Sequence, residues 1–348
     1  MINNIINLSA HRLQQNRRQT GLSLVELMVA IVIGSFVLLG LSSIFLSSNR
    51  ASVEMRKSTQ QQENGRYASQ LLYDDLMLAG YLAEFDATPL TSPDDLPDIC
   101  TTDMAELLTA LPLHVQGVND AVATPSCLTD LKAGTDIIVV RRASTCVAGS
   151  AGCAAFLANA PHFQASLCTP TDGTATELAF LANTNAEYAT QHFAFDNTLT
   201  SFTRRRTSCG TTMADIHRYL VHIYFVANNN EDGDGIPTLK RAEIGATGFS
   251  IVPLVDGIEN MQVQYGVDIS SDGVPDSYTS VPASVEDWRN TMGARVHLLA
   301  RNTVTTPGYS DTSAYVLGDV NIAAPGDAYK RHVYSTAVQF VNPSWRRQ

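Results

Sequence analysis

A long apolar stretch near the amino terminus limits what this chain can become more than any other feature. Between Leu22 and Leu46 nearly every residue is apolar or small, and Glu26 is the only charged one. A run of about 20 such residues crosses the hydrocarbon core of a bilayer as a helix. An ionisable group inside that core is costly, so Glu26 needs either a partner or a function.

The segment before the apolar run is basic and differs from an ordinary secretory signal. Residues 1–21 contain Arg12, Arg17 and Arg18, no acidic residue and no sustained apolar core. In a secretory signal the small residue at the cleavage site follows the apolar core, whereas here Gly21 precedes it. A cut after Gly21 would therefore remove the basic leader and keep the helix. The arginines place the amino terminus in the cytoplasm by the positive-inside rule.

The helical pattern continues beyond the apolar run. Residues 47–82 contain no proline, and small or apolar residues recur at spacings of three and four, namely Ala68, Leu72, Leu76, Ala79 and Ala83. We expect one helix over 22–82, about 90 Å long at 1.5 Å per residue, with an assembly half over 22–46 and an amphipathic half over 47–83. Gly34 and Gly40 either permit close helix approach or are simply tolerated.

The residues around Gly21 resemble a known processing signal. The segment 21–27, GLSLVEL, is similar to the amino-terminal signal of type IV prepilins and type II secretion pseudopilins. The resemblance implies that a prepilin peptidase cuts between Gly21 and Leu22 and N-methylates Leu22, and that Glu26 guides subunit docking. Leu22 departs from the Phe that is commonest at this position, and the leader is longer than many.

Electrostatics suggests how Glu26 would act after such a cut. Cleavage leaves a cationic amine on Leu22, one helical turn from Glu26, and a helix amino terminus favours an anion. We predict that Glu26 pairs with the amine of an adjacent subunit in a fibre, which satisfies two charges otherwise stranded in lipid. The alternatives are pairing with Leu22 of its own chain or an approach of Glu26 to the lipid headgroups.

The remainder, residues 84–348, reads as a periplasmic, β-rich head. Thr, Pro and Asp dominate 86–125, with a short helix expected over 104–111. Strands are expected in the apolar or alternating segments 136–142, 177–182, 218–227, 260–268, 294–300 and 331–341. No long helical pattern separates them, so antiparallel pairing is expected. The prediction is an α+β type IV pilin fold: a long amino-terminal helix packed on a mainly antiparallel sheet.

Further motifs resemble one pilin family in particular. Residues 65–81, GRYASQLLYDDLMLAGY, are similar to a segment of the PilW family of minor pilins, and four later segments follow that family's order: 232–239, 254–268, 294–301 and 334–339. The resemblance implies a structural minor pilin that primes type IV pilus assembly at the fibre tip. Its partners would be prepilin peptidase, other minor pilins, the major pilin, a tip adhesin and the inner membrane. The insert over about 86–213 matches nothing in this pattern.

All six cysteines lie beyond the apolar run, and none shows the paired spacing of a zinc site. An even number on one side of a membrane suggests disulfides in an oxidising compartment. The simplest of the fifteen connectivities joins neighbours, Cys100 with Cys127, Cys146 with Cys153 and Cys168 with Cys209. The alternative is that they are buried free thiols.

Two acidic segments partly resemble calcium-binding loops. Oxygen-bearing side chains alternate in NNNEDGDG, residues 228–235, as in calcium loops, which gives the weak candidates Asn228, Asn230, Asp232 and Asp234. Leu239 stands where an EF-hand has its bidentate Glu. A second partial set comprises Asp268, Ser270, Asp272 and Asp276. The favoured interpretation is tight turns between strands, so no cofactor is expected.

The sequence gives no sign of an enzyme. The histidines lack a metal-binding spacing, and no nucleophile elbow or phosphate loop occurs. Arg204, Arg205 and Arg206 form the one basic run, which indicates a solvated strand edge or else a site for an acidic partner. The formal net charge of −11 argues against contact with nucleic acid.

Two other functions fit parts of the same pattern. A minor pseudopilin of a type II secretion system would share the signal and the architecture. A membrane-anchored periplasmic binding module or sensor would keep residues 1–21, because its apolar run would be an uncleaved anchor.

Overall fold

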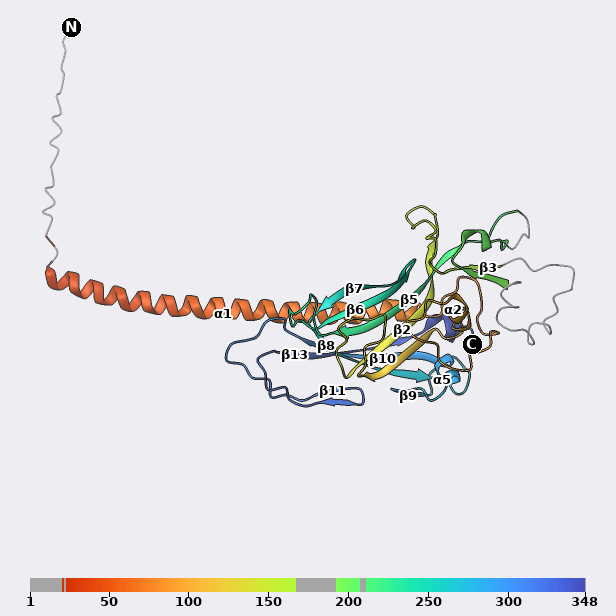
Figure 1. Cartoon of the computed structure of the whole chain (residues 1–348). Coiled ribbons are helices and arrows are strands. Elements are labelled where there is room, and N and C mark those ends of the chain that lie inside the picture. The colour runs from red at the N-terminus through yellow and green to blue at the C-terminus, as the bar shows by residue number, and fades with distance from the viewer. Residues whose placement is uncertain (1–20, 22, 167–191, 207–210, 348) are drawn as a thin grey trace, which may run out of the picture. The chain divides into compact units, whose positions relative to one another are not determined.

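A computed structural model describes residues 21, 23–166, 192–206 and 211–347. It shows a long amino-terminal helix and a mainly antiparallel β head, which confirms the predicted α+β pilin fold (Figure 1). The chain forms two compact units, residues 1–55 and 56–348, which are taken separately below.

The helix α1 runs over Leu24–Met77 and belongs to the first unit up to residue 55. It ends at Met77, not at Leu82 as the spacing of apolar residues predicted. Residues 78–80 form a turn, and Gly80 adopts a φ of 71°, a conformation that ends helices and suits glycine. The amide of Gly80 then donates to the carbonyl of Arg141 at 3.0 Å, so the chain passes directly from helix to sheet.

The remaining helices are short. They are α2 (Met104–Thr109), α5 (Val285–Arg289), α6 (Val341–Trp345) and the 3-10 turn η1 (Leu199–Ser201). Asp103 caps α2 by accepting from the amides of Ala105 and Glu106, which accounts for the helix expected over 104–111. Ser284 and Asp287 form a capping box on α5.

A seven-stranded antiparallel sheet forms the first layer of the head. It consists of β1 (Val115–Ala121), β2 (Thr135–Val147), β3 (His162–Ala165), β4 (Phe193–Asp196), β5 (His217–Ala227), β6 (Thr238–Gly245) and β7 (Gly248–Asp256). The path β1-β2-β5-β3-β4 is joined by β6, which pairs with β5 and β7. The central strands β2 and β5 are buried on both faces, which explains why they read as continuous apolar runs.

A four-stranded antiparallel sheet forms the second layer, in the order β13-β10-β8-β9. Its strands are β8 (Ile258–Val267), β9 (Ser277–Thr279), β10 (Thr291–Arg301) and β13 (Arg331–Gln339), and a small hairpin of β11 (Tyr315–Leu317) and β12 (Val320–Ile322) completes the fold. The four strands expected between 218 and 341 are thus present with boundaries shifted by one to three residues. The strand expected over 177–182 lies outside the described residues.

Several strands had no clear signal in the sequence. β1 lies within the segment expected to be irregular, and its VQGVNDA contains glycine and two turn-forming residues. It forms because β2 offers an edge, and its pairing is broken by a register shift between Val118 and Ala121. The β6–β7 hairpin was also missed, since charged residues interrupt its apolar pattern.

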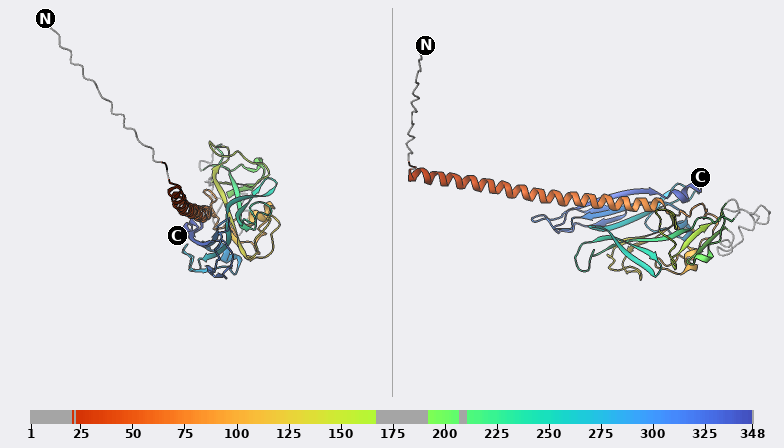
Figure 2. Two further views of the ribbon diagram at one scale, coloured as in Figure 1. Left: turned by 90° about the vertical axis from the view of Figure 1, so that its left-hand side faces the viewer. Right: turned by 90° about the horizontal axis from the view of Figure 1, so that it is seen from above.

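Two hydrophobic cores lie on opposite faces of the seven-stranded sheet. One contains Ile138 and Val140 of β2, the four-stranded sheet and the buried side of α1. The other contains Ile137 and Val139 of β2 together with residues from the irregular segment after α1. In Figure 2 the carboxy-terminal strands, in blue, run beside the part of α1 that belongs to the head.

We expect Gly65→Ala to destabilise the head, although alanine favours a helix by about 1 kcal/mol. A Cβ at Gly65 would lie 2.2 Å from Cε2 of Tyr334 on β13, and forcing the ring aside costs about 1–3 kcal/mol. Thermal unfolding of the full chain in detergent measures the change. Gly40→Ala is the control, because its Cβ meets nothing within 4 Å; an unchanged or raised melting temperature for Gly65→Ala would refute the close packing.

Candidate functional site

The amino-terminal site contains the residues expected to direct processing and assembly. Gly21 is exposed and non-helical, α1 begins at Leu24, and Glu26 is exposed in its first turn. Leu22 lies outside the described residues, as does the leader up to residue 20. Gly21 thus lies before the helix start and Glu26 after it, and α1 begins at Leu24 where a start at residue 22 was expected.

The first unit exposes its apolar side chains. Every large apolar residue between Leu24 and Leu46 is at least half exposed, and α1 is long and apolar enough to cross a membrane. Folded proteins rarely leave such a surface in water. This half of α1 is therefore built to be covered by lipid or by other helices.

The second unit fixes its part of α1 through a buried carboxylate. Asp75 is 6% exposed and lies on the last turns of the helix. Its Oδ1 accepts from Nε of Arg142 at 2.7 Å, and its Oδ2 accepts from Nδ1 of His222 at 2.6 Å and from the Tyr224 hydroxyl at 2.7 Å. Three side chains from β2 and β5 thus converge on one carboxylate of α1.

The environment of Asp75 favours its charged form. Burial by itself would raise the pKa of Asp75, but the hydrogen bond from His222 and nearby positive charges, Arg142 included, hold that pKa well below its usual value. The Tyr224 hydroxyl also accepts from Arg241 at 3.3 Å, and Arg241 pairs with Glu243. The network therefore extends from α1 across β5 to β6. Asp75 lies in the 65–81 motif, but the sequence did not reveal that its partners come from β2 and β5.

A second buried network holds the long connection between β10 and β13. The side chain of Arg331 is 1% exposed and binds Glu259, Asp311 and Asp327, with N–O distances of 2.5, 3.0 and 2.6 Å. Asp311 is fully buried and also accepts from the Tyr315 hydroxyl at 2.8 Å. Because bidentate arginine contacts fix geometry, this network orients the start of β13.

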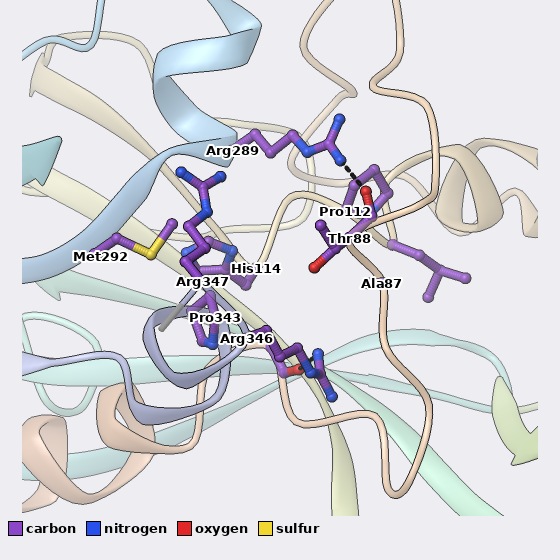
Figure 3. A pocket seen from close by; sticks show the side chains of 11 residues that line it. Ala87, Thr88, Pro112, His114, Arg289, Met292, Pro343, Arg346 and Arg347 are labelled. Atoms are coloured by element: carbon purple, nitrogen blue, oxygen red, sulfur yellow. Dashed lines mark hydrogen bonds between the residues drawn. The ribbon is translucent and has the colours of Figure 1, made fainter. Parts of the chain in front are cut away.

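A small hollow lies where the chain leaves α1 (Figure 3). Its volume is about 40 Å³, and its lining includes His114 and three arginines but no carboxylate. Arg289 reaches the Thr88 carbonyl, Arg346 donates to the Phe85 carbonyl at 2.5 Å, and Arg347 contacts Asp268 at 3.3 Å. The arginines therefore fasten loops, and the space suits a few water molecules.

His114 at this hollow is structural. Its Nε2 lies 2.5 Å from the Thr291 carbonyl. Burial, together with the charges of Arg347 and Arg346, lowers the pKa of His114 to about 4. A neutral histidine donating to a strand carbonyl links β1 to β10 and has no nucleophile or acid beside it in the hollow.

The structure forms two of the three disulfides in the neighbour pairing. Cys100 bonds to Cys127 and Cys146 to Cys153. Cys168 and Cys209 lie outside the described residues, so their pairing stays a prediction. The first bond closes the irregular segment over the second core, and the second closes a turn at the end of β2.

The loop proposed as a weak calcium candidate uses its oxygens for its own turn. Asp234 accepts from the backbone amides of Asn230, Glu231 and Ile236, and these bonds lower the pKa of Asp234. Lys240 donates its Nζ to the Asn230 carbonyl at 3.0 Å, which adds a positive charge where a cation would sit. Asn228 binds Asp130 across the loop, and Asp232 is exposed.

The second acidic set behaves in the same way. Asp268 accepts from the amides of Ser271 and Gly273, and Asp276 accepts from those of Ile269 and Ser270. Among the described residues, no group of three His, Cys, Asp or Glu side chains could hold a metal ion. The side chain of Asp272 accepts from the backbone amide of Val274, two residues further along the chain, as expected of a turn.

The remaining predicted residues serve the fold separately. Arg206 pairs with Asp215, Arg205 donates to the Thr211 carbonyl, and Arg204 donates to the Phe193 carbonyl at 3.0 Å. The arginine run thus ties neighbouring chain segments together. His217 binds the Ser144 carbonyl and His297 the Ser335 hydroxyl, so the structure does not gather the histidines into one site.

Comparison with known families gives two matches. Residues 223–342 match the family model described as Type IV Pilus-assembly protein W, and residues 16–42 match the prokaryotic N-terminal methylation motif. The first match covers the end of β5, the β6–β7 hairpin, the four-stranded sheet and the β11–β12 hairpin. The second match contains Gly21, Leu22 and Glu26. No curated protein and no solved structure matches the chain.

We expect Asp75→Asn to lower the free energy of unfolding at pH 7 by about 3–5 kcal/mol, because it leaves Arg142 and His222 buried without their carboxylate. The folded-state pKa of Asp75 is lowered, so its contribution to stability is present above the unfolded-state pKa of about 4 and is lost as the pH falls below it. The difference between Asp75→Asn and wild type should therefore shrink below pH 4. Denaturant unfolding between pH 2 and 7 measures it.

The matched control is Asp74→Asn, because Asp74 is exposed on the same turn and accepts a hydrogen bond from Gln70 at 2.7 Å. Equal losses from both variants would show that Asp75 does not fasten the helix.

We expect EDTA to leave the melting temperature of the purified full chain unchanged, with or without added Ca²⁺. The carboxylate of Asp234 is already satisfied by three backbone amides, so calcium would have to displace them. Differential scanning calorimetry measures the effect. A melting temperature that rises with Ca²⁺ and falls in Asp234→Ala would reinstate a calcium site.

Proposed function

The chain belongs to the PilW family of type IV pilus-assembly proteins, and on this premise we propose that it is a processed minor pilin that primes pilus assembly. The observation that carries the proposal is the coexistence of a prepilin signal at one end of α1 with the family's strand pattern in the head. Both family matches point to a structural role in pilus assembly.

Processing is proposed to occur between Gly21 and Leu22. The methylation-motif match spans this bond, and Gly21 is exposed ahead of the helix. A membrane peptidase needs access to the backbone, and Gly21 lies outside α1, whose hydrogen bonds would close a bond within the helix. Methylation of the new amine on Leu22 keeps its positive charge.

Glu26 then supplies the matching negative charge. It is the only acidic or basic residue in the exposed apolar part of α1, residues 24–46. A carboxylate surrounded by apolar side chains costs free energy unless an opposite charge approaches. Pairing with the Leu22 amine of a neighbouring subunit would make helix assembly both register-specific and favourable.

The apolar half of α1 is proposed to serve twice, first as an inner-membrane anchor and later as part of a fibre core. The basic residues before the span favour an amino terminus in the cytoplasm and a head in the periplasm. The disulfides Cys100–Cys127 and Cys146–Cys153 support the same orientation, because such bonds persist in an oxidising compartment. Two packed sheets and the insert make a large head. We place it in a tip complex with other minor pilins and an adhesin, above the major pilin.

We expect Glu26→Gln to be cleaved normally but to enter fibres at least roughly ten-fold less, the scale of one uncompensated charge in lipid. Immunoblots of sheared pili against membrane fractions give the incorporation, and amino-terminal sequencing gives the cleavage site. Glu63→Gln is the control, since Glu63 is exposed on α1 beyond the apolar half.

Two results would contradict the proposal. Normal fibre entry of Glu26→Gln would remove the charge-pairing mechanism. An intact Met1 on the mature protein would indicate an uncleaved anchor, and with it a membrane-bound binding module or sensor.

A further inference from the structure

The strand β13 lies at the edge of its sheet, and it differs from the other edge strands that the structure describes in how its edge is protected. Native sheets protect their edges with proline, bulges or short length, because a free edge can pair with another chain. β7 carries Pro253 and a register shift, β1 is interrupted by a register shift, and β4 and β9 have four and three residues. β13 pairs with β10 over nine residues in unbroken register and contains no proline.

The hydrogen bonds at the two ends of β13 show which backbone groups are free. The backbone amide of Phe340 donates to the carbonyl of Met292, and the carbonyl of Lys330 accepts from the backbone amide of Asn302. Antiparallel strands alternate between residues bonded to the partner and residues that point away. The outward groups are therefore those of the odd-numbered residues Arg331, Val333, Ser335, Ala337 and Gln339. Within the described residues, β13 pairs with β10 alone.

A groove runs beside this edge, between β13 and the exposed side of α1. It consists of two hollows of about 490 and 510 Å³ that share Arg66 and Tyr334. In Figure 1 β13 lies beside the head portion of α1. The even-numbered residues of β13 face α1, since Tyr334 packs against Gly65 and Val338 lies in the core with Leu72.

The groove is basic on an acidic protein. The formal net charge is −11, yet no Asp or Glu lines either hollow, whereas Arg66, Lys330, Arg331 and His332 do. Arg331 is neutralised by its own carboxylates. Arg66 is exposed and forms no ion pair with any described residue. The charge of the groove therefore complements an acidic segment.

We propose that β13 is a docking edge for an extended acidic segment of a different pilus subunit, which adds a fifth strand to the four-stranded sheet. Its backbone would bond to the outward groups of β13, as in other cases of strand addition. Its alternate side chains would lie in the groove, with a carboxylate on Arg66. That the donor is a pilus subunit rests on the function proposed above.

The test places a photo-crosslinking amino acid at His332 of the full chain in pilus-producing cells. His332 is exposed and lines the groove. We expect one adduct, whose partner peptide, identified by mass spectrometry, is an acidic segment of another pilin-type subunit.

Two substitutions then test the contributions of the strand edge and of the groove separately. Ala337→Pro removes one outward amide and puts a ring in the path of an added strand, while the pairing with β10 stays intact. Arg66→Glu reverses the charge of the groove. We expect each to reduce the adduct at least five-fold, whereas Arg56→Glu, an exposed arginine on the same helix, leaves it unchanged. Thermal unfolding shows whether each variant folds. If Ala337→Pro does not fold, Arg66→Glu still tests the groove.

Three outcomes would overturn the docking edge: no adduct at His332, an adduct between two copies of this chain, or an adduct that persists in folded Arg66→Glu. The proposed pilin function fails separately. An intact Met1 rejects that function, whereas a mature amino terminus at Leu22 without any adduct rejects the docking edge alone.

Discussion

A buried carboxylate joins the two halves of this protein's architecture. Asp75 is the last charged residue of α1 and receives hydrogen bonds from β2 and β5 at 2.6–2.7 Å. A buried charge demands such partners, since leaving it unpaired costs several kcal/mol. Apolar packing of Ala68, Leu72 and Leu76 would hold the helix on the sheet but would tolerate sliding or rotation. The carboxylate, with three donors at fixed positions, permits a single register.

The part of α1 in the first unit has a different requirement. Its apolar side chains are exposed from Leu24 to Leu46, and a surface of this kind needs lipid or neighbouring helices to cover it. Within the head, the Arg331 network fixes β13, because it anchors the long connection that precedes the strand.

The sequence predicts best the features that depend on residues close together along the chain. The apolar run, Glu26 and Gly21 are local features, and the strands β2, β5, β8, β10 and β13 carry strong apolar or β-branched runs. The end of α1 was placed five residues late because Ala79 and Ala83 continue the apolar spacing, while the positive φ of Gly80 and its bond to Arg141 end the helix. β1 gave no strand signal because glycine and turn-forming residues interrupt it, and the β6–β7 hairpin gave none because charged residues break the apolar pattern of β6.

The sequence by itself determined that the chain carries a membrane-length apolar helix with one acidic residue, an N-terminal methylation motif at its start and a β-rich head of the PilW type. Only the tertiary structure decided that Asp75 is the link between helix and sheet, and that β13 is a sheet edge beside a basic groove. The reason is physical. Hydropathy and turn chemistry act between neighbours along the chain, whereas a buried ion pair or a free strand edge depends on which distant groups the fold brings near it.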